Sequence, residues 1–337
     1  MESWRLGQVH LPVTGLIVAV YTKINDSELK SFLAAYDFGE LLSSVGITEG
    51  VENSNYLLST KRGRYILTIY EKRVRPNDLP FFLCLMKYLA SRGVVCPVPV
   101  VGNDGRVLRE IAGKPAAILT FLSGSAEPQP GPRWCGGLGK ELATLHLAGQ
   151  DFAGSRPNDL SVNSWDRLLS RVEGRADEVK PGLVKDLQAE ITELSAAWPV
   201  GLPQGIIHAD LFPDNVLFVN GAISGLIDFY FACTDLFAYD LAICLNSWCF
   251  EPDGAFNATK ARLMLSAYRR VRPFSRAELK VLPLLCRGAA LRFLLTRLYD
   301  WLNAPEGALV RPKDPLEYFH KLGFHRQVRG PGEYGLD

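Results

Sequence analysis

The stretch from residue 206 to residue 229 constrains the fold more than any other part of this sequence. It reads IIHADLFPDNVLFVNGAISGLIDF, and its dipeptide Asn220-Gly221 separates two β-rich runs. Asn-Gly is the strongest short-range signal for a β-hairpin, because both residues tolerate the positive φ angles that a tight turn requires. The sequence therefore predicts a hairpin whose second strand ends at Asp228 and whose first strand follows a polar loop.

Three side chains around this hairpin have the chemistry of phosphoryl transfer. Asp210 and Asn215 lie five residues apart on the loop, and Asp228 follows the second strand of the hairpin. Transfer of a phosphoryl group requires a residue that orients the hydroxyl and oxygen ligands that hold magnesium. The order of these residues is that of the catalytic and metal-binding loops of kinases. We expect Asp210 to be the base and Asn215 and Asp228 to bind Mg²⁺.

The other polar residues of the loop are expected to have structural roles. His208 is better suited to bracing the loop than to carrying a proton, because Asp210 is better placed for that task. Asp214, next to a proline, is expected to cap the turn. The alternative for the whole stretch is a polar turn that arose by chance.

The patterns on the two sides of a proline-rich segment differ in kind. Residues 18–122 alternate like strands around two helical segments and predict a small sheet-based lobe. Residues 123–132, SGSAEPQPGP, read as a linker. Residues 133–337 show mainly helical spacing and predict a larger helical lobe. The expected fold class is α+β, with two lobes.

The same patterns predict the individual elements. The predicted strands are 56–59, 65–70 and two within 107–124. The predicted helices are 26–38 (beginning at Asp26 or Ser27), 77–93, 135–149, 164–172, 183–198, 238–248, 258–271 and 279–302.

Composition excludes several classes of partner and site. The chain of 337 residues has 37 basic and 36 acidic residues and a net charge of +1, so bulk attraction to nucleic acid or to an anionic membrane is not expected. Its seven cysteines show no C-x-x-C spacing, which favours buried thiols in a reducing compartment over disulfides or zinc. The N-terminal segment lacks the features of a signal peptide, and its apolar run is too short to span a bilayer. We expect a cytoplasmic protein.

Two motifs identify a family. IIHADLFPDNVLF and GLIDFYFACTDLFAYDLAI resemble the catalytic and metal-binding motifs of the aminoglycoside phosphotransferase superfamily, which has a protein-kinase-like fold. Longer stretches, among them YDFGELLSSVGITEGVENSNYLLST and RGAALRFLLTRLYDWL, resemble the bacterial homoserine kinase family within it. The resemblance runs from about Val18 to the C-terminus and leaves residues 1–17 outside. It implies ATP- and Mg²⁺-dependent phosphorylation of the L-homoserine hydroxyl, a step of threonine biosynthesis.

The resemblance also implies nucleotide contacts. The segment GITEGVENSN is at the position of the phosphate loop, where the implied contacts come from Gly46, Gly50 and Asn53. Glycines there let backbone N–H groups approach an anion, although two glycines before a strand are also ordinary turn residues. The segment TFLSG is at the hinge between the lobes, where Thr120 to Leu122 (including Phe121) would pair with adenine or belong to the core.

One position departs from the wider kinase pattern. The third strand of a kinase carries a lysine that contacts the α- and β-phosphates, and here this position is Thr68. Lys72 and Arg73 lie just beyond the strand. Either could take the place of the lysine, or Mg²⁺ and loop amides could handle the phosphate charge. If they do not, the chain would be a nucleotide-binding module without activity.

An acceptor such as homoserine needs a cation for its carboxylate and an acid for its ammonium group. A bidentate arginine matches a carboxylate best, so Arg287 and Arg292, with Arg297, are candidates; the alternative is a salt bridge to Asp240 or Asp300. Asp235 could bind the ammonium group or cap a loop. Helical spacing adds further candidates to the site, namely Tyr239, Asp240 and Asn246.

We expect Trp248 and Trp301 to pack in the core and His146 to be structural. Another small-alcohol kinase, for choline, methylthioribose or an aminoglycoside, is the alternative within the same superfamily.

Overall fold

The computed structural model describes residues 22–47, 53–71, 74–304 and 312–336. The expectations for residues 1–17, Gly50, Lys72 and Arg73 lie outside these ranges.

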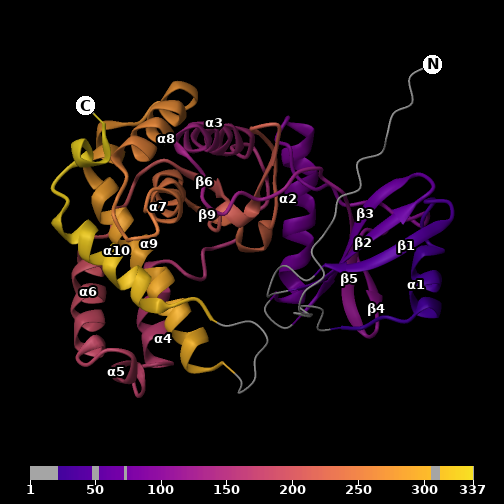
Figure 1. Cartoon of the computed structure of the whole chain (residues 1–337), viewed down its shortest axis with the longest axis horizontal. Helices are drawn as coiled ribbons and strands as arrows, with labels where there is room; N and C mark the ends of the chain where they lie inside the picture. Colours follow the sequence, from indigo (N-terminus) through magenta and orange to yellow (C-terminus); the bar gives the residue numbers. More distant parts are fainter. Residues whose placement is uncertain (1–21, 48–52, 72–73, 305–311, 337) are drawn as a thin grey trace.

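An antiparallel sheet forms the N-terminal part of the structure (Figure 1). Its strands are ordered β1-β2-β3-β5-β4. They span β1 (Leu41–Ile47), β2 (Asn53–Thr60), β3 (Gly63–Tyr70), β4 (Arg109–Ile111) and β5 (Lys114–Thr120). Helix α1 (Asp26–Leu33) covers one face and buries Leu29 and Phe32 against Leu58 and Leu67 of the sheet. Its N-cap is Asn25, one residue before the expected cap, because Asn25 and Glu28 form a reciprocal capping box.

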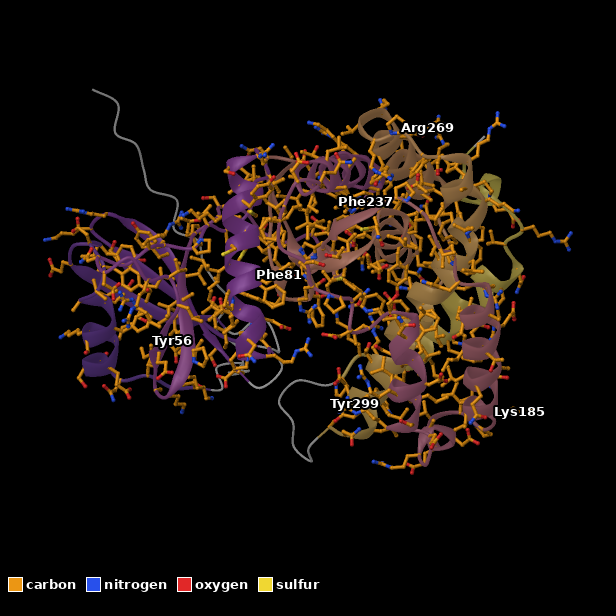
Figure 2. All side chains as sticks on the ribbon, turned by 180° about the vertical axis from the view of Figure 1, so that it is seen from behind. Tyr56, Phe81, Lys185, Phe237, Arg269 and Tyr299 are labelled. Carbon is orange, nitrogen blue, oxygen red and sulfur yellow. The ribbon has the colours of Figure 1, made fainter. Side chains whose placement is uncertain are left out.

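Helix α2 (Leu79–Ser91) lies between the sheet and the helical part of the molecule (Figure 1). Its buried Phe82 and Leu85 belong to the same apolar cluster as the helices that follow. Phe81, which Figure 2 labels on this helix, packs edge-on against Phe152 of the helical part, with ring centroids 5.7 Å apart. The apolar face of α2 therefore binds the first part of the chain to the second.

The remainder of the chain is mainly helical, and the expected two-part α+β fold is confirmed. The helices are α3 (Pro132–Ala148), α4 (Trp165–Ser170), α5 (Ala176–Val179), α6 (Leu183–Ala197), α7 (Phe237–Trp248), α8 (Ala258–Val271), α9 (Arg276–Leu302) and α10 (Pro315–Gln327). Two antiparallel strand pairs interrupt them, β6 (Gln204–Ile207) with β9 (Cys233–Leu236) and β7 (Val216–Val219) with β8 (Ala222–Leu226). The second pair is the expected hairpin, with Asn220 and Gly221 both at positive φ. Helix α10 and the β6–β9 pair were not predicted.

Of the two tryptophans that we expected in the core, one is buried and the other is exposed. Trp248 is buried, whereas Trp301 is 45% exposed near the C-terminal end of α9, so the prediction that it packs in the core is wrong. All seven cysteine thiols are free, and six are buried as small apolar residues. Within the described residues, no helix is both long and apolar enough to cross a bilayer.

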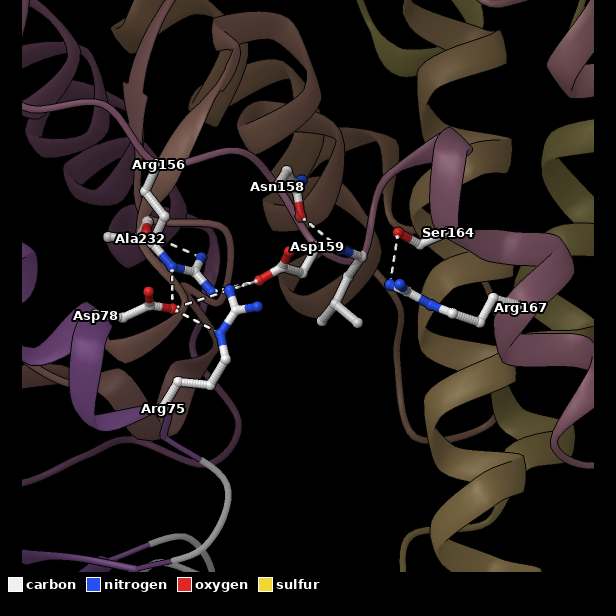
Figure 3. Close-up of polar contacts among 9 residues, drawn as sticks. Arg75, Asp78, Arg156, Asn158, Asp159, Ser164, Arg167 and Ala232 are labelled. Carbon is white, nitrogen blue, oxygen red and sulfur yellow. Dashed lines mark hydrogen bonds and ion pairs between the residues drawn. The ribbon is translucent and has the colours of Figure 1, made fainter.

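Four charged side chains join the N-terminal end of α2 to the segment that precedes α4 (Figure 3). Arg156 donates to Asp78 Oδ2 at 2.9 Å and to Asp159 Oδ2 at 2.7 Å. Arg75 bonds to the same two carboxylates. Partial burial opposes ionisation of Asp78, but the bonds from Arg156 and Arg75 outweigh it and lower the pKa of Asp78. This network holds α2 against the helical part of the molecule.

A buried histidine of α10 makes stability depend on pH. His325 Nδ1 lies 2.8 Å from the Tyr334 hydroxyl, and Nε2 lies 3.2 Å from Asn246 Oδ1. Burial, reinforced by the charge of Lys321, lowers the pKa of His325 to about 3, well below its unfolded value of about 6.5. The neutral ring therefore adds to stability above pH 6.5, and this contribution is lost as the pH falls towards 3.

We expect the wild-type protein to lose about 2 kcal/mol more unfolding free energy between pH 8 and pH 5 than a His325→Gln variant does. Urea denaturation at the two pH values measures this difference. His320→Gln is the control, because His320 lies on the exposed face of the same helix and the substitution should leave the pH dependence of the wild type intact. Equal pH dependence in the His325→Gln variant and the wild type would contradict the prediction.

Candidate active site

The loop after β6 brings Asp210 and Asn215 together. Residues Pro213–Asn215 form one 3-10 turn, which folds the loop back on itself. Asn215 Nδ2 donates to the backbone oxygen of Asp210 at 2.8 Å and lies 3.5 Å from the carboxylate oxygen Oδ2. The side chain of Asp210 is 20% exposed, so its carboxylate is accessible.

The hairpin holds Asp228 beside this loop. The backbone N–H of Ile227 donates to the oxygen of Asn215 at 2.9 Å, and His208 Nε2 donates to the oxygen of Ile227 at 3.0 Å. Both peptide groups of Ile227 are therefore fixed to the loop, and Asp228 is the next residue. Asp228 has φ 64° and ψ 64°, a left-handed conformation that aspartate tolerates better than most residues.

Ala209, between His208 and Asp210, is held in a strained conformation. Its φ is 63°, which costs a residue with a Cβ atom roughly 1–2 kcal/mol. The backbone N–H of Ala209 donates to Asp240 Oδ1 at 2.8 Å, and the N–H of His208 donates to Asp240 Oδ2, also at 2.8 Å. Strain of this kind persists where surrounding contacts impose it, which is common at functional sites.

Asp240, which we expected at the acceptor site, instead supports the backbone of the loop. It is fully buried on α7, and its Oδ2 also accepts from His146 Nε2 at 3.1 Å. Burial opposes ionisation, but the bond from His146 and the other donors outweigh it and lower the pKa of Asp240. With both oxygens occupied in the core, the carboxylate is not open to a ligand.

His208 braces the loop through both ring nitrogens. Nδ1 accepts from the backbone N–H of Asp210 at 3.3 Å, while Nε2 donates to Ile227. Burial lowers the pKa of His208, so the ring is neutral and can accept and donate at the same time. His146 is likewise buried and bonds to Asp240 and to the Tyr268 hydroxyl.

The three arginines of α9 have different environments. Arg287 bonds to Glu190 at 2.9 Å and to Glu193 at 2.7 Å, so it faces α6 and not the loop. Arg297 bonds to Glu317 of α10 at 2.6 Å. The salt-bridge alternative therefore holds for these two, with glutamates in place of the expected aspartates. Arg292 alone among the three contacts the loop that carries Asp210, through the backbone oxygen of Ala209.

Two further acceptor candidates, Asn246 and Tyr239, are buried in the core. Asn246 Nδ2 donates to backbone oxygens of Ala242 and Cys286, so this side chain is used in the core. Tyr239 is buried with its ring edge-on to Trp198 at 5.5 Å. These two expected acceptor contacts are not open to a ligand.

Asp235 accepts from Asn158 Nδ2 at 2.8 Å, and it lies in β9 opposite Gly205 of β6. Burial raises the pKa of Asp235. The loop that carries Asp210 leaves β6 after Ile207, two residues beyond Gly205.

The expected nucleotide residues line the sheet and its junction with the hairpin. Gly46 is in β1, and buried Asn53 begins β2, where its Oδ1 accepts from the backbone N–H of Glu71. Thr120 ends β5 and bonds to Val98 through its backbone and its hydroxyl.

The segment after β5 is attached to the hairpin. Leu122 packs so closely on Gly225 of β8 that a Cβ atom there would lie 2.6 Å from its Cδ1. Backbone bonds join Ser125 and Phe218 in both directions. Phe121 instead packs under the guanidinium of Arg64, 4.1 Å from the ring centroid. The segment that we expected to form the hinge therefore packs on β8, the strand that ends two residues before Asp228.

Hydroxyl groups lie at and near Thr68, the position where the wider kinase pattern has a lysine. Thr68 donates to Asn55 at 2.8 Å, and the hydroxyls of Tyr70 and Tyr230 lie 3.1 Å apart across the junction of sheet and helical part. Burial raises the pKa of Tyr230, and the charge of Asp228 adds to this effect. The two tyrosines were not singled out from the sequence, although Tyr230 stands directly after the Asp-Phe pair.

Comparisons with known proteins show the family of this chain. Residues 44–274 match the model of the phosphotransferase enzyme family. The homoserine kinase of Rhodospirillum rubrum is 61% identical over 95% of this chain and 99% of its own length. That of Xanthobacter autotrophicus is 60% identical with the same coverage. The structure of an amicoumacin kinase in complex with AMP-PNP and Ca²⁺ has a TM-score of 0.69 at 15% identity, covering 91% of this chain and 95% of that one. The chain therefore belongs to the phosphotransferase enzyme family, and within it to the homoserine kinases.

Proposed function

We propose that this enzyme transfers the γ-phosphoryl group of ATP to the side-chain hydroxyl of L-homoserine with the help of Mg²⁺. The observation that carries this proposal is that the two backbone bonds of Ile227 hold Asp228 beside the loop of Asp210 and Asn215, in a chain 57–61% identical to curated homoserine kinases. The product would be O-phospho-L-homoserine, an intermediate on the route to threonine.

The residues beside the loop fit a magnesium ion. The carboxylate of Asp228 and the amide oxygen of Asn215 are hard oxygen donors of the kind that Mg²⁺ prefers. Asn215 uses its amide nitrogen to bond the backbone of Asp210, so its Oδ1 remains for a cation. When bound, the ion neutralises charge on the phosphates of the nucleotide.

Asp210 supplies the proton acceptor. The hydroxyl oxygen of homoserine forms a bond to the γ-phosphorus, the bond from that phosphorus to the ADP oxygen breaks, and the hydroxyl proton moves to the Asp210 carboxylate. His208 is neutral and bonded on both sides, so it holds the loop without taking part in this transfer.

A coupled ADP-release assay with a panel of alcohols tests the proposed acceptor. L-Homoserine should give kcat/KM values at least about 10²-fold above those for choline, methylthioribose and aminoglycosides, because these lack the α-amino acid group that a homoserine site must bind. A higher value for one of the others would identify a different alcohol kinase. A nucleotide-dependent thermal shift without ADP release from any alcohol would identify a binding module.

Replacing Asp228 by asparagine should weaken the use of Mg²⁺. We expect the Mg²⁺ concentration for half-maximal rate to rise at least about tenfold, because an amide is a poorer ligand than a carboxylate. Mg²⁺ titration of ADP release measures the change, and Asp214→Asn is the control, because Asp214 is exposed on the loop and paired with Lys313. An unchanged titration curve would rule out the ligand role of Asp228.

A further inference from the structure

Arg292 is a buried cation of α9 that the proposed reaction does not use. Only 2% of its side chain is exposed. Its guanidinium carbon lies 4.3 Å from the ring centroid of Phe293 and 5.7 Å from that of Phe231. A charge in such surroundings needs compensating polar partners. Among the described residues, those partners belong to the loop that carries Asp210.

The guanidinium meets this loop at two consecutive residues. Nη1 donates to the backbone oxygen of Ala209, and Nη2 lies 3.9 Å from the carboxylate oxygen Oδ1 of Asp210. Within the described residues, Nε makes no hydrogen bond. The side chain is therefore committed to the loop and is almost closed to solvent, which does not suit a contact with the carboxylate of a diffusing substrate.

Ala209 is consequently held from two sides by opposite charges. Asp240 of α7 accepts from its N–H, and Arg292 of α9 donates to its oxygen. Its left-handed φ of 63° is one that alanine rarely adopts unaided. Because Asp210 follows directly, the dihedral angles of Ala209 set the direction in which the Asp210 side chain leaves the backbone.

We infer that Arg292 is a positioning residue, which fixes the Asp210 carboxylate by holding the strained backbone of Ala209 from α9. The inference rests on the proposed function, because Asp210 acts as the base only in that proposal. It replaces the expectation that Arg292 binds the carboxylate of homoserine. A base displaced by about 1 Å can lose roughly 10²-fold in rate, so the effect should appear in kcat.

Two substitutions of Arg292 and one of Arg287 form the test. Arg292→Met keeps an unbranched side chain but removes the charge and all donors, whereas Arg292→Lys keeps a donor for the Ala209 oxygen. Arg287→Met is the matched control, because Arg287 lies on the same helix but pairs with Glu190 and Glu193. For each variant we would measure kcat, KM for homoserine, Kd for the nucleotide and Tm.

Arg292→Met should lower kcat about 10²-fold, with KM and Kd within about threefold of wild type, and Arg292→Lys should recover about tenfold of the loss. Arg287→Met should lower Tm but leave kcat within about twofold. If Arg292→Met does not fold, Arg292→Lys carries the test, with kcat about tenfold below wild type.

Wild-type kcat in the folded Arg292 variants would overturn the inference. So would a rise in KM for homoserine at unchanged kcat, which would instead indicate a contact with the substrate. Asp210→Asn separates this failure from failure of the proposed function. If Asp210→Asn is inactive while the Arg292 variants are not impaired, only the positioning role is lost; if Asp210→Asn remains active, the proposed base is wrong.

Discussion

Asp210→Asn should lower kcat by at least about 10³-fold while nucleotide binding persists. The amide has nearly the same shape as the carboxylate but cannot accept the hydroxyl proton. The bond from Asn215 Nδ2 goes to the backbone oxygen of residue 210, so the loop should keep its conformation. ADP release with homoserine measures the rate, and a nucleotide-dependent thermal shift measures binding.

Asp214→Asn is the matched control for this prediction. Asp214 lies on the same loop, but its side chain is 66% exposed and pairs only with Lys313 at 3.3 Å among the described residues. Its kcat should remain within about twofold of wild type, since exposed ion pairs contribute little. Full kcat in the Asp210→Asn variant would show that another group accepts the proton, and would remove the central assignment of the proposed mechanism.

Asp240→Ala should be the most destabilising of the substitutions considered for this protein. The carboxylate accepts from the backbone N–H groups of His208 and Ala209 and from His146, and it is fully buried. Removing it leaves these donors without an acceptor in the core. Loss of one partner of a buried charged network typically costs about 3–5 kcal/mol. The loop should also lose its conformation, so kcat should fall together with stability.

Urea denaturation and ADP release of the same Asp240→Ala preparation measure both effects. Asp235→Ala is an informative comparison, because Asp235 is only partly buried and its carboxylate bonds to Asn158, Ser161 and the backbone N–H of Leu236, none of which belongs to the loop of Asp210. The Asp235→Ala substitution should cost less stability and should leave the loop of Asp210 intact. A folded Asp240→Ala variant with wild-type stability and rate would show that the loop does not depend on this carboxylate.

The sequence predicted correctly those elements whose structure depends on residues close together in the chain. The hairpin followed from the turn preference of Asn220 and Gly221, and most of the helices followed from apolar spacing, because both depend on neighbours in the chain. The proximity of Asp210 and Asn215 followed for the same reason: one short turn joins them. The expected α+β fold with a sheet-based and a helical part is confirmed on this basis.

The sequence could not assign the charged and polar residues of α7 and α9, and the structure shows why. Helix α7 is buried almost throughout, so apolar spacing does not reveal which of its faces meets the loop. Asp240 turned out to face it, whereas Asn246 bonds to Cys286 and His325 in the core. Trp301 was misplaced because apolar composition does not show which residues of the last turn of α9 face the core: Trp301 is 45% exposed, whereas its neighbour Leu302 is 9% exposed.

By itself, the sequence determined that a polar loop and a hairpin carry Asp210, Asn215 and Asp228 in the order typical of a kinase. Only the tertiary structure decided that Asp240 and Arg292 hold the backbone between them, while Arg287 pairs with glutamates on α6. The physical reason is that a turn is specified by the residues within it. The partner of a buried charge, in contrast, depends on which distant elements pack together.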